Sequence, residues 1–141
     1  MDAARLLLFS GGLAIFFSSL LGVAMLVPMQ PWGQRLVAKA KLKPIGAAHL
    51  DWIVLALMQG LAAGVIVGFD LSVSPWAAWA LVFGGWANPL PYVFRAFGVN
   101  AFAFAGPLHQ RLAAALGGLS SAAILYGWAV ILTGAWTAWP P

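Results

Sequence analysis

The sequence predicts an all-α integral membrane protein, a bundle of four transmembrane helices that forms a single domain over residues 1–141. Two observations support this fold class. The first is composition, since 63% of the residues are hydrophobic, only 7% are charged, and the mean hydropathy is +0.94. A soluble domain carries roughly 25% charged residues, so this chain cannot cover a water-facing surface. The second is that four apolar segments reach the length of about 20 residues that a spanning helix needs.

The four predicted helices cover residues of about 6–28, 45–68, 75–97 and 107–136. Prolines mark their boundaries, because proline is tolerated in the first turn of a helix but not in its interior. The first helix ends at Pro28 and Pro31, and the others open at Pro44, Pro75 and Pro107. The first segment is longer than the apolar run of a signal peptide, and no clear small-residue cleavage site precedes the basic linker, so we expect a retained helix.

The basic residues of the chain gather in two linkers. The net charge is +4, and the linker after the first helix contains Arg35, Lys39, Lys41 and Lys43, while Arg95 and Arg111 flank the linker after the third. Four spans place these two linkers on one side, whereas the opposite side holds only Arg5, offset by Asp2. The positive-inside rule then predicts that both basic loops are cytoplasmic and that both termini lie outside. Such loops favour anionic headgroups over nucleic acid as partners.

Small residues recur at four-residue spacing and predict faces where helices pack closely. They form one triplet, Gly60, Gly64 and Gly68, and two pairs, Gly84 with Asn88 and Gly117 with Ser121. The chain has no cysteine, which excludes disulfides, iron–sulfur clusters and thiolate ligands.

The few polar side chains within the predicted spans are the candidate functional residues. His49 and Asp51 lie near the start of the second helix, Asn88 and Tyr92 lie near the end of the third, and His109 opens the fourth. An ionisable group in a span is costly, so it usually faces the bundle interior and has a partner or a function. All of these residues lie toward the basic end, which predicts a polar pocket between helices there. Two structural alternatives remain open. His49 and Asp51 could simply cap a helix at the interface, and Asn88 could satisfy backbone freed by Pro89 while Tyr92 belongs to the aromatic belt.

A zinc ion needs three or four protein ligands. The basic side of the predicted bundle offers only His49, His109 and Asp51, so a structural zinc site is disfavoured. A b-type haem needs one imidazole, which His49 could supply, with Arg95 and Arg111 as candidate partners of the propionates. Serines lie in apolar helices without a neighbouring histidine and acid in sequence, so nucleophilic catalysis has little support.

Several short motifs resemble one family over residues of about 45–110. They are Ala48-His49-Leu50-Asp51, Gly85-Trp86-Ala87-Asn88 with Tyr92, and Gly106-Pro107. Together they are similar to the small four-helix membrane isomerases, a group that contains the styrene oxide isomerases and the hydroxylaminobenzene mutases.

The resemblance implies a homotrimer of the cytoplasmic membrane that binds haem b through His49. It implies that ferric iron acts as a Lewis acid on an aryl epoxide, so that the benzylic C–O bond opens and a hydride shift gives the aldehyde. Tyr92 and Asn88 match the residues of the family's pocket and would orient the substrate, with Asp51 or Gln59 supporting them. Pocket walls of Trp52, Phe83, Trp86 and Phe94 would suit a small aromatic, lipid-soluble substrate.

The chain also departs from the family pattern. Leu55 stands where the family has an asparagine after the histidine, and Gly84 stands where the epoxide isomerase has an acid. Asp51 is closer to the His-Leu-Glu pattern of the mutases. A mutase that rearranges aryl hydroxylamines to aminophenols is therefore the first alternative. A non-enzymatic membrane subunit, either structural or carrying haem for electron transfer, is the second.

Overall fold

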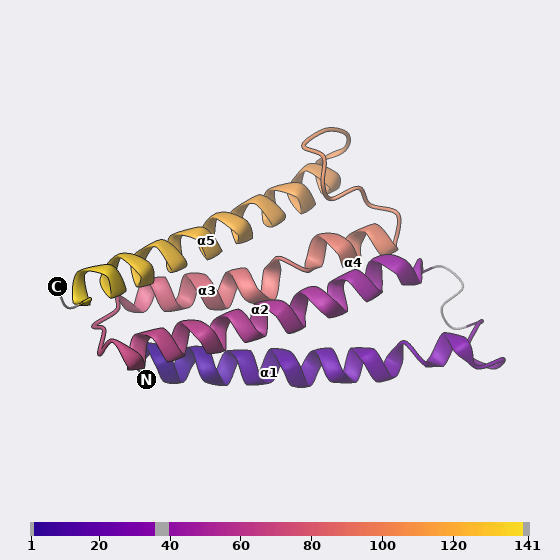
Figure 1. The fold of residues 1–141 in the computed structure, drawn as a ribbon. Coiled ribbons are helices and arrows are strands. Elements are labelled where there is room, and N and C mark those ends of the chain that lie inside the picture. The colour runs from indigo at the N-terminus through magenta and orange to yellow at the C-terminus, as the bar shows by residue number, and fades with distance from the viewer. Residues whose placement is uncertain (1, 36–39, 140–141) are drawn as a thin grey trace.

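A computed structural model describes residues 2–35 and 40–139 and shows an all-helical bundle. In those residues the helices are α1 (Ala3–Ala24), the 3-10 turn η1 (Val27–Met29), α2 (Leu42–Gly68), α3 (Pro75–Ala87), α4 (Leu90–Ala96) and α5 (Leu108–Ala138). The chain runs along the bundle four times in alternating directions, with α3 and α4 sharing one pass, so both termini lie at the same end (Figure 1). The all-α prediction is confirmed.

Three of these helices are long and apolar enough to cross a membrane: α1 with η1, α2, and α5. The predicted third span is instead divided into α3 and α4, of 13 and 7 residues, neither of which is long enough alone. The physical reason is the sequence Asn88-Pro89-Leu90-Pro91, because proline lacks the N–H that continues the helical hydrogen bonds. Four separate spans are therefore not shown by the helices alone.

The helices begin and end close to the expected residues. Asp2 caps α1 by accepting a hydrogen bond from the Arg5 backbone at 2.8 Å, and its carboxylate also pairs with the Arg5 side chain. The α4 helix ends in a Schellman motif, with Gly98 at a φ of +90°. The α2 helix ends in the same motif, but Asp70 takes the left-handed position with a φ of +49°. Aspartate tolerates this conformation better than most residues.

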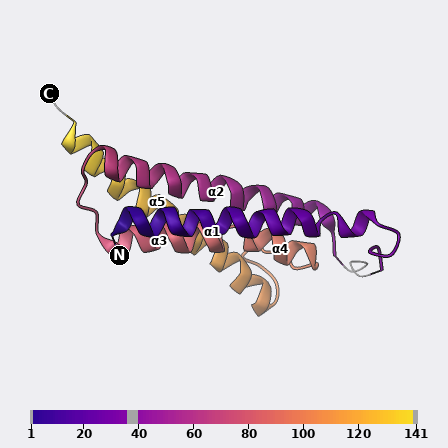
Figure 2. The same cartoon turned by 90° about the horizontal axis from the view of Figure 1, so that it is seen from below.

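The apolar core lies in the half of the bundle that holds the termini. It joins α1, α2, α3 and α5 through small and aliphatic side chains, chiefly Leu7, Ala62, Ala78, Leu81 and Ile131. Figures 1 and 2 show α1 lying along α2, and α5 packed on α3 but standing away from α4 at its own N-terminal end. The half with the core is thus closely packed, and the half with α4 is more open.

The glycine predictions have a mixed outcome. A Cβ on Gly84 would lie 2.9 Å from the Ser120 carbonyl oxygen, and one on Gly117 would lie 3.0 Å from Pro91, so both glycines allow close helix approach. Gly60, Gly64 and Gly68 were expected to pack in the same way, but no described atom lies within 4 Å of a Cβ at these positions. That prediction is wrong for contacts within the chain, because this face of α2 has no neighbouring helix.

Candidate functional site

His49 is held against α1 by Ser18, 31 residues earlier in the chain. Because α2 begins at Leu42 rather than at the expected residue 45, His49 lies about two turns into the helix. Its Nδ1 lies 2.9 Å from the Ser18 carbonyl oxygen and 2.8 Å from the Ser18 hydroxyl. The Ser18 hydroxyl also lies 2.8 Å from the His49 carbonyl oxygen. Ser18 is fully buried, so this pair of residues locks the start of α2 to the middle of α1.

These distances determine which ring nitrogen of His49 carries the proton. A carbonyl oxygen can only accept, so Nδ1 must donate its hydrogen to the Ser18 carbonyl oxygen. The single hydroxyl proton of Ser18 then goes to the His49 carbonyl oxygen. In the opposite tautomer two lone pairs would face each other at 2.9 Å. The neutral ring therefore keeps its lone pair on Nε2, and Ser18 does not act as a nucleophile activated by His49.

The other edge of the imidazole rests on Gly22. A Cβ at Gly22 would lie 3.0 Å from Cε1 and 3.5 Å from Nε2 of His49, so any larger residue would push the ring. Among the described residues, Nε2 has no hydrogen-bond partner. An imidazole whose Nδ1 donates to a backbone carbonyl while Nε2 is free has the arrangement typical of a metal-ligating histidine.

An apolar hollow of about 500 Å³, here called the aromatic groove, is lined by neighbours of the His49–Ser18 pair but not by His49 itself. Trp52 is three residues after His49 and therefore shares its face of α2, and Trp52 lines the groove. Phe17, the neighbour of Ser18, packs edge-on against Trp52 with ring centroids 4.8 Å apart. The remaining lining residues come from α3 and α4 and are Val82, Phe83, Trp86, Ala87, Leu90 and Val93. Of the four predicted walls, Trp52, Phe83 and Trp86 line the groove, and Phe94 does not.

Asp51 lies on the other side of α2, since two residues correspond to about 200° around a helix. The amide nitrogen of Asn88 donates to Asp51 at 3.4 Å. The amide oxygen of Asn88 accepts from Ser120 at 3.1 Å and from Ser121 at 3.0 Å. We call these four residues the polar cluster. Each serine hydroxyl also lies within 2.9 Å of the Gly117 carbonyl oxygen. Because a hydroxyl has one proton, the Gly117 carbonyl and the Asn88 amide oxygen compete for the proton of each serine.

A side chain binds one of the carbonyls at the break between α3 and α4. The last four carbonyls of a helix lack partners within it, and at membrane depth each must find another donor. The indole of Trp52 donates to the Trp86 carbonyl oxygen at 3.3 Å, and the indole of Trp86 donates to the Ser10 hydroxyl at 3.1 Å. Trp52 therefore has two roles, as a wall of the aromatic groove and as a cap for α3.

Tyr92 and Asn88 line a different hollow, here called the loop pocket, of about 320 Å³. It lies where α5 stands away from α4, and residues 101–104 of the α4–α5 loop close it. The ring of Phe102 packs edge-on against Tyr92 at 5.1 Å. Asn88 and Tyr92 therefore line one hollow, and their role toward a substrate stays a prediction. His49 does not line this pocket, so the structure divides the expected site between two sides of α2.

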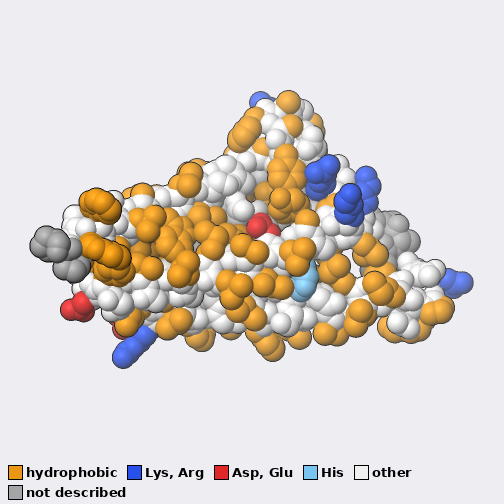
Figure 3. All heavy atoms as spheres, in the orientation of Figure 1, with side chains coloured by type: hydrophobic (Ala, Val, Ile, Leu, Met, Phe, Trp, Pro, Cys, Tyr) orange, Lys and Arg blue, Asp and Glu red, His pale blue; other side chains and the backbone are white. Residues whose placement is uncertain are grey.

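The predicted charged partners all lie at the surface. Arg95, Arg111 and His109 are exposed, and the guanidinium of Arg95 lies 5.7 Å from the centre of the Phe102 ring. Figure 3 shows that lysine and arginine side chains gather at the end of the molecule away from the termini. Arg35, Lys41 and Lys43 are exposed there too, and Lys39 lies outside the described residues.

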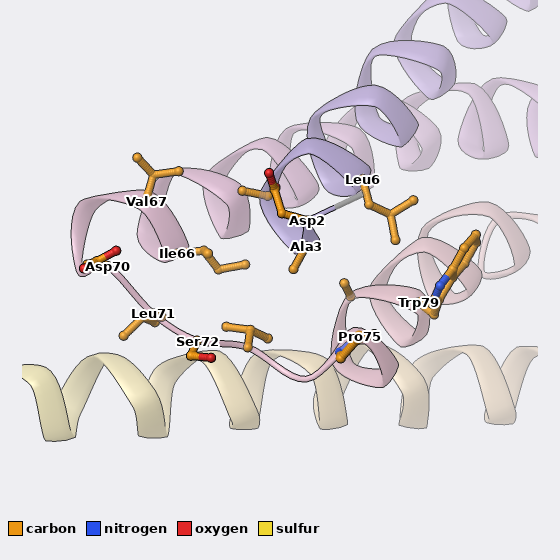
Figure 4. A pocket seen from close by; sticks show the side chains of 13 residues that line it. Asp2, Ala3, Leu6, Ile66, Val67, Asp70, Leu71, Ser72, Pro75 and Trp79 are labelled. Carbon is orange, nitrogen blue, oxygen red and sulfur yellow. The ribbon is translucent and has the colours of Figure 1, made fainter.

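A further hollow of about 460 Å³ lies at the opposite end, where the α2–α3 loop passes the start of α1. Asp2 and Asp70 stand on separate sides of it, with apolar side chains such as Leu6 and Ile66 between them (Figure 4). The Asp2 carboxylate already caps α1. Residues 2–35 and 40–139 contain no group of three His, Asp or Glu side chains that could hold a metal ion by themselves.

No protein family model, curated protein or solved structure matches this chain significantly. The candidate site therefore has to be interpreted from its own geometry.

Sequence reasoning overlooked the residues that position the candidates. Ser18 and Gly22 place the His49 ring, and Ser120 and Ser121 bind Asn88. The available signal was that a serine in an apolar helix needs an acceptor, which here is a carbonyl or an amide on another helix.

Proposed function

We propose that this chain is a membrane isomerase that binds ferric haem b through Nε2 of His49 and rearranges an aryl epoxide to an aldehyde. The observation that carries the proposal is the state of His49. Its Nδ1–H is held by the Ser18 carbonyl oxygen, and its Nε2 has no hydrogen-bond partner among the described residues. Trp52, three residues after His49 on α2, lines the aromatic groove.

The residues present fit such a cofactor. One neutral imidazole is sufficient as a protein ligand for haem, and the hydrogen bond to a backbone carbonyl fixes the tautomer and the orientation of the ring. When bound, ferric haem supplies Lewis acidity that stabilises negative charge developing on an epoxide oxygen. Arg95 and Arg111 are the candidate partners for its propionates, since both are exposed cations, one at the end of α4 and the other at the start of α5.

The protein's own contribution is binding, orientation and exclusion of water. The rings of Phe17, Trp52 and Trp86 form walls that suit an aromatic substrate, which would enter from lipid. Opening the benzylic C–O bond while a hydride moves from the terminal carbon to the benzylic carbon needs no co-reactant. A dry, apolar groove prevents water from capturing the developing carbocation, which would give a diol.

The proposal includes the arrangement in the membrane. The α3–α4 pass, with Asn88 and Pro89, extends over about 33 Å, similar to the hydrocarbon core of about 30 Å. We therefore propose four crossings of the cytoplasmic membrane, with the basic end cytoplasmic and both termini outside. A homotrimer is proposed by resemblance. The gathering of basic side chains at one end and of the termini at the other supports this orientation.

An isotope experiment tests the reaction. The purified, haem-loaded protein is given phenyloxirane with both terminal hydrogens replaced by deuterium, without any reductant. A 1,2-hydride shift predicts phenylacetaldehyde that retains both deuterium atoms, one on the benzylic carbon and one on the carbonyl carbon. Loss of one deuterium to solvent would contradict the hydride shift.

A parallel assay separates the alternatives. If the protein converts phenylhydroxylamine to an aminophenol and does not turn over the epoxide, the proposal is wrong and the mutase hypothesis is supported. A reversible redox couple with no turnover of either compound would favour an electron-transfer subunit.

A further inference from the structure

Two polar atoms in the centre of the bundle have no partner among the described residues. They are the amide oxygen Oε1 of Gln59 and the indole nitrogen Nε1 of Trp128. Gln59 is only 2% exposed, and its amide nitrogen donates to the Leu81 carbonyl oxygen at 3.4 Å. One of the two unpaired atoms is an acceptor and the other is a donor, so their hydrogen-bonding needs are complementary.

Both residues line the same cavity, of about 10 Å³, between α2, α3 and α5. The other side chains around it are apolar and include Leu55, Met58 and Ile124. Gly85 makes room for this arrangement, because a Cβ at this position would collide with the amide nitrogen of Gln59. The cavity is therefore a small space whose polar lining atoms include one buried acceptor and one buried donor.

We propose that this cavity is a binding site for a single water molecule. The water accepts a hydrogen bond from Nε1–H of Trp128 and donates one to Oε1 of Gln59. A cavity of roughly 10–15 Å³ holds one water, and a buried water needs at least two polar partners, which this cavity supplies. A larger ligand does not fit, and no charged side chain lines the cavity to hold an ion.

The bound water explains a glutamine in an apolar helix. Without it, two buried polar groups at membrane depth would lose the hydrogen bonds that they make in water. With it, Gln59 is joined to α3 through the Leu81 carbonyl oxygen and to α5 through Trp128. The site is independent of His49 and of the proposed reaction, because neither residue lines the aromatic groove or the loop pocket.

Rotating-frame NMR of the full protein, labelled with ¹⁵N at the tryptophan indoles, tests this proposal. The Trp128 indole signal is identified by its disappearance in Trp128→Phe. We expect this indole proton to show a cross-peak to the water resonance with the sign of a dipolar contact. Trp52 is the matched control, because its indole donates to the Trp86 carbonyl oxygen, and we expect no such cross-peak from it.

Gln59→Met keeps the length of the side chain and removes the acceptor. We expect the Trp128 cross-peak to disappear while the other indole signals keep their positions, which also shows that the variant is folded. A Trp128 indole without a water contact in the wild type would overturn the proposal, since Trp128 would then bond Gln59 directly or stay unpaired. An unchanged cross-peak in Gln59→Met would also overturn it, as would equal cross-peaks from Trp52.

Discussion

The two polar groups of side chains on α2 differ in what they leave available. His49 and Ser18 form a small unit in which every polar atom has a partner except Nε2. The polar cluster around Asn88 joins α2, the α3–α4 break and α5, and both ends of the Asn88 amide are occupied. The first unit presents a lone pair to a ligand, whereas the second uses its hydrogen bonds to hold helices together.

We therefore expect the His49–Ser18 unit to bind a ligand and the polar cluster to position helices, although both lie in the same half of the bundle. Changes on the His49 side should act on haem and leave the helices in place. Changes in the polar cluster should act on stability and leave haem ligation in place. Tyr92 lies beside the polar cluster but points into the loop pocket, so its effect distinguishes whether that pocket contributes to turnover.

Gly22→Val is expected to have the largest effect. The added methyl groups would displace the His49 ring, which already lies 3.0 Å from the position of a Cβ, and would weaken its hydrogen bond to Ser18. Disturbing such an outer partner of a metal ligand lowers affinity by about 10- to 100-fold. Haem titration in detergent measures this change. Gly12→Val in the same helix is the control, since no atom of the described residues lies within 4 Å of a Cβ there. Equal affinities for the two variants would contradict the assigned role of Gly22.

Asn88→Ala is expected to lower the free energy of unfolding by about 2 kcal/mol, because it leaves the half-buried Asp51 without its donor and breaks the link from α2 to Ser120 and Ser121 of α5. Denaturation from mixed micelles measures this loss. Gln34→Ala, at an exposed position, should stay within about 0.5 kcal/mol of the wild type. If Asn88→Ala instead removed haem without changing stability, the two regions would not be separate.

Tyr92→Phe removes only a hydroxyl and keeps the ring against Phe102. The resemblance that assigns Tyr92 to the substrate pocket predicts that kcat falls about tenfold with an unchanged absorption spectrum, as for the loss of one hydrogen bond to substrate. A substrate held wholly in the aromatic groove predicts no change in kcat. Tyr126→Phe, an exposed tyrosine on α5, is the matched control and should turn over at the wild-type rate. Wild-type kcat for Tyr92→Phe would remove Tyr92 and the loop pocket from the reaction.

Arg95→Gln should have the smallest effect, a rise of about threefold in the Kd for haem, because an exposed ion pair contributes no more than about 1 kcal/mol. Arg111→Gln should behave similarly. Arg5→Gln, at the other end of the bundle, should not change the Kd. Identical values for all three variants would exclude both arginines as propionate partners.

The sequence predicted the helices well because prolines, glycines and apolar length mark their ends. Pro75 begins the α3–α4 pass as expected, the pass ends at Ala96 close to the expected residue 97, and Pro89 with Pro91 explains its break. It predicted the contacts between helices poorly. The helices are apolar on every side, so no stripe indicates which face meets which neighbour.

The candidate residues could be chosen from the sequence because so few polar groups lie in the spans, but their grouping could not. His49 and Asp51 are two residues apart and were expected in one pocket, yet one faces Ser18 and the other faces Asn88. Only the rotation of α2 about its own axis decides this, and that rotation depends on packing against helices distant in sequence. Gly60, Gly64 and Gly68 illustrate the same limit, since their spacing predicts a packing face that no described residue covers.

The visible absorption spectrum of the purified protein tests the central claim, that the free Nε2 of His49 binds haem. It is recorded after loading with haem for the wild type, His49→Ala and His109→Ala, where His109 is the exposed histidine of α5. The account predicts a strong Soret band in the wild type and in His109→Ala, and its loss in a folded His49→Ala. A band that persists without His49, or a folded wild-type protein that stays colourless, would contradict it.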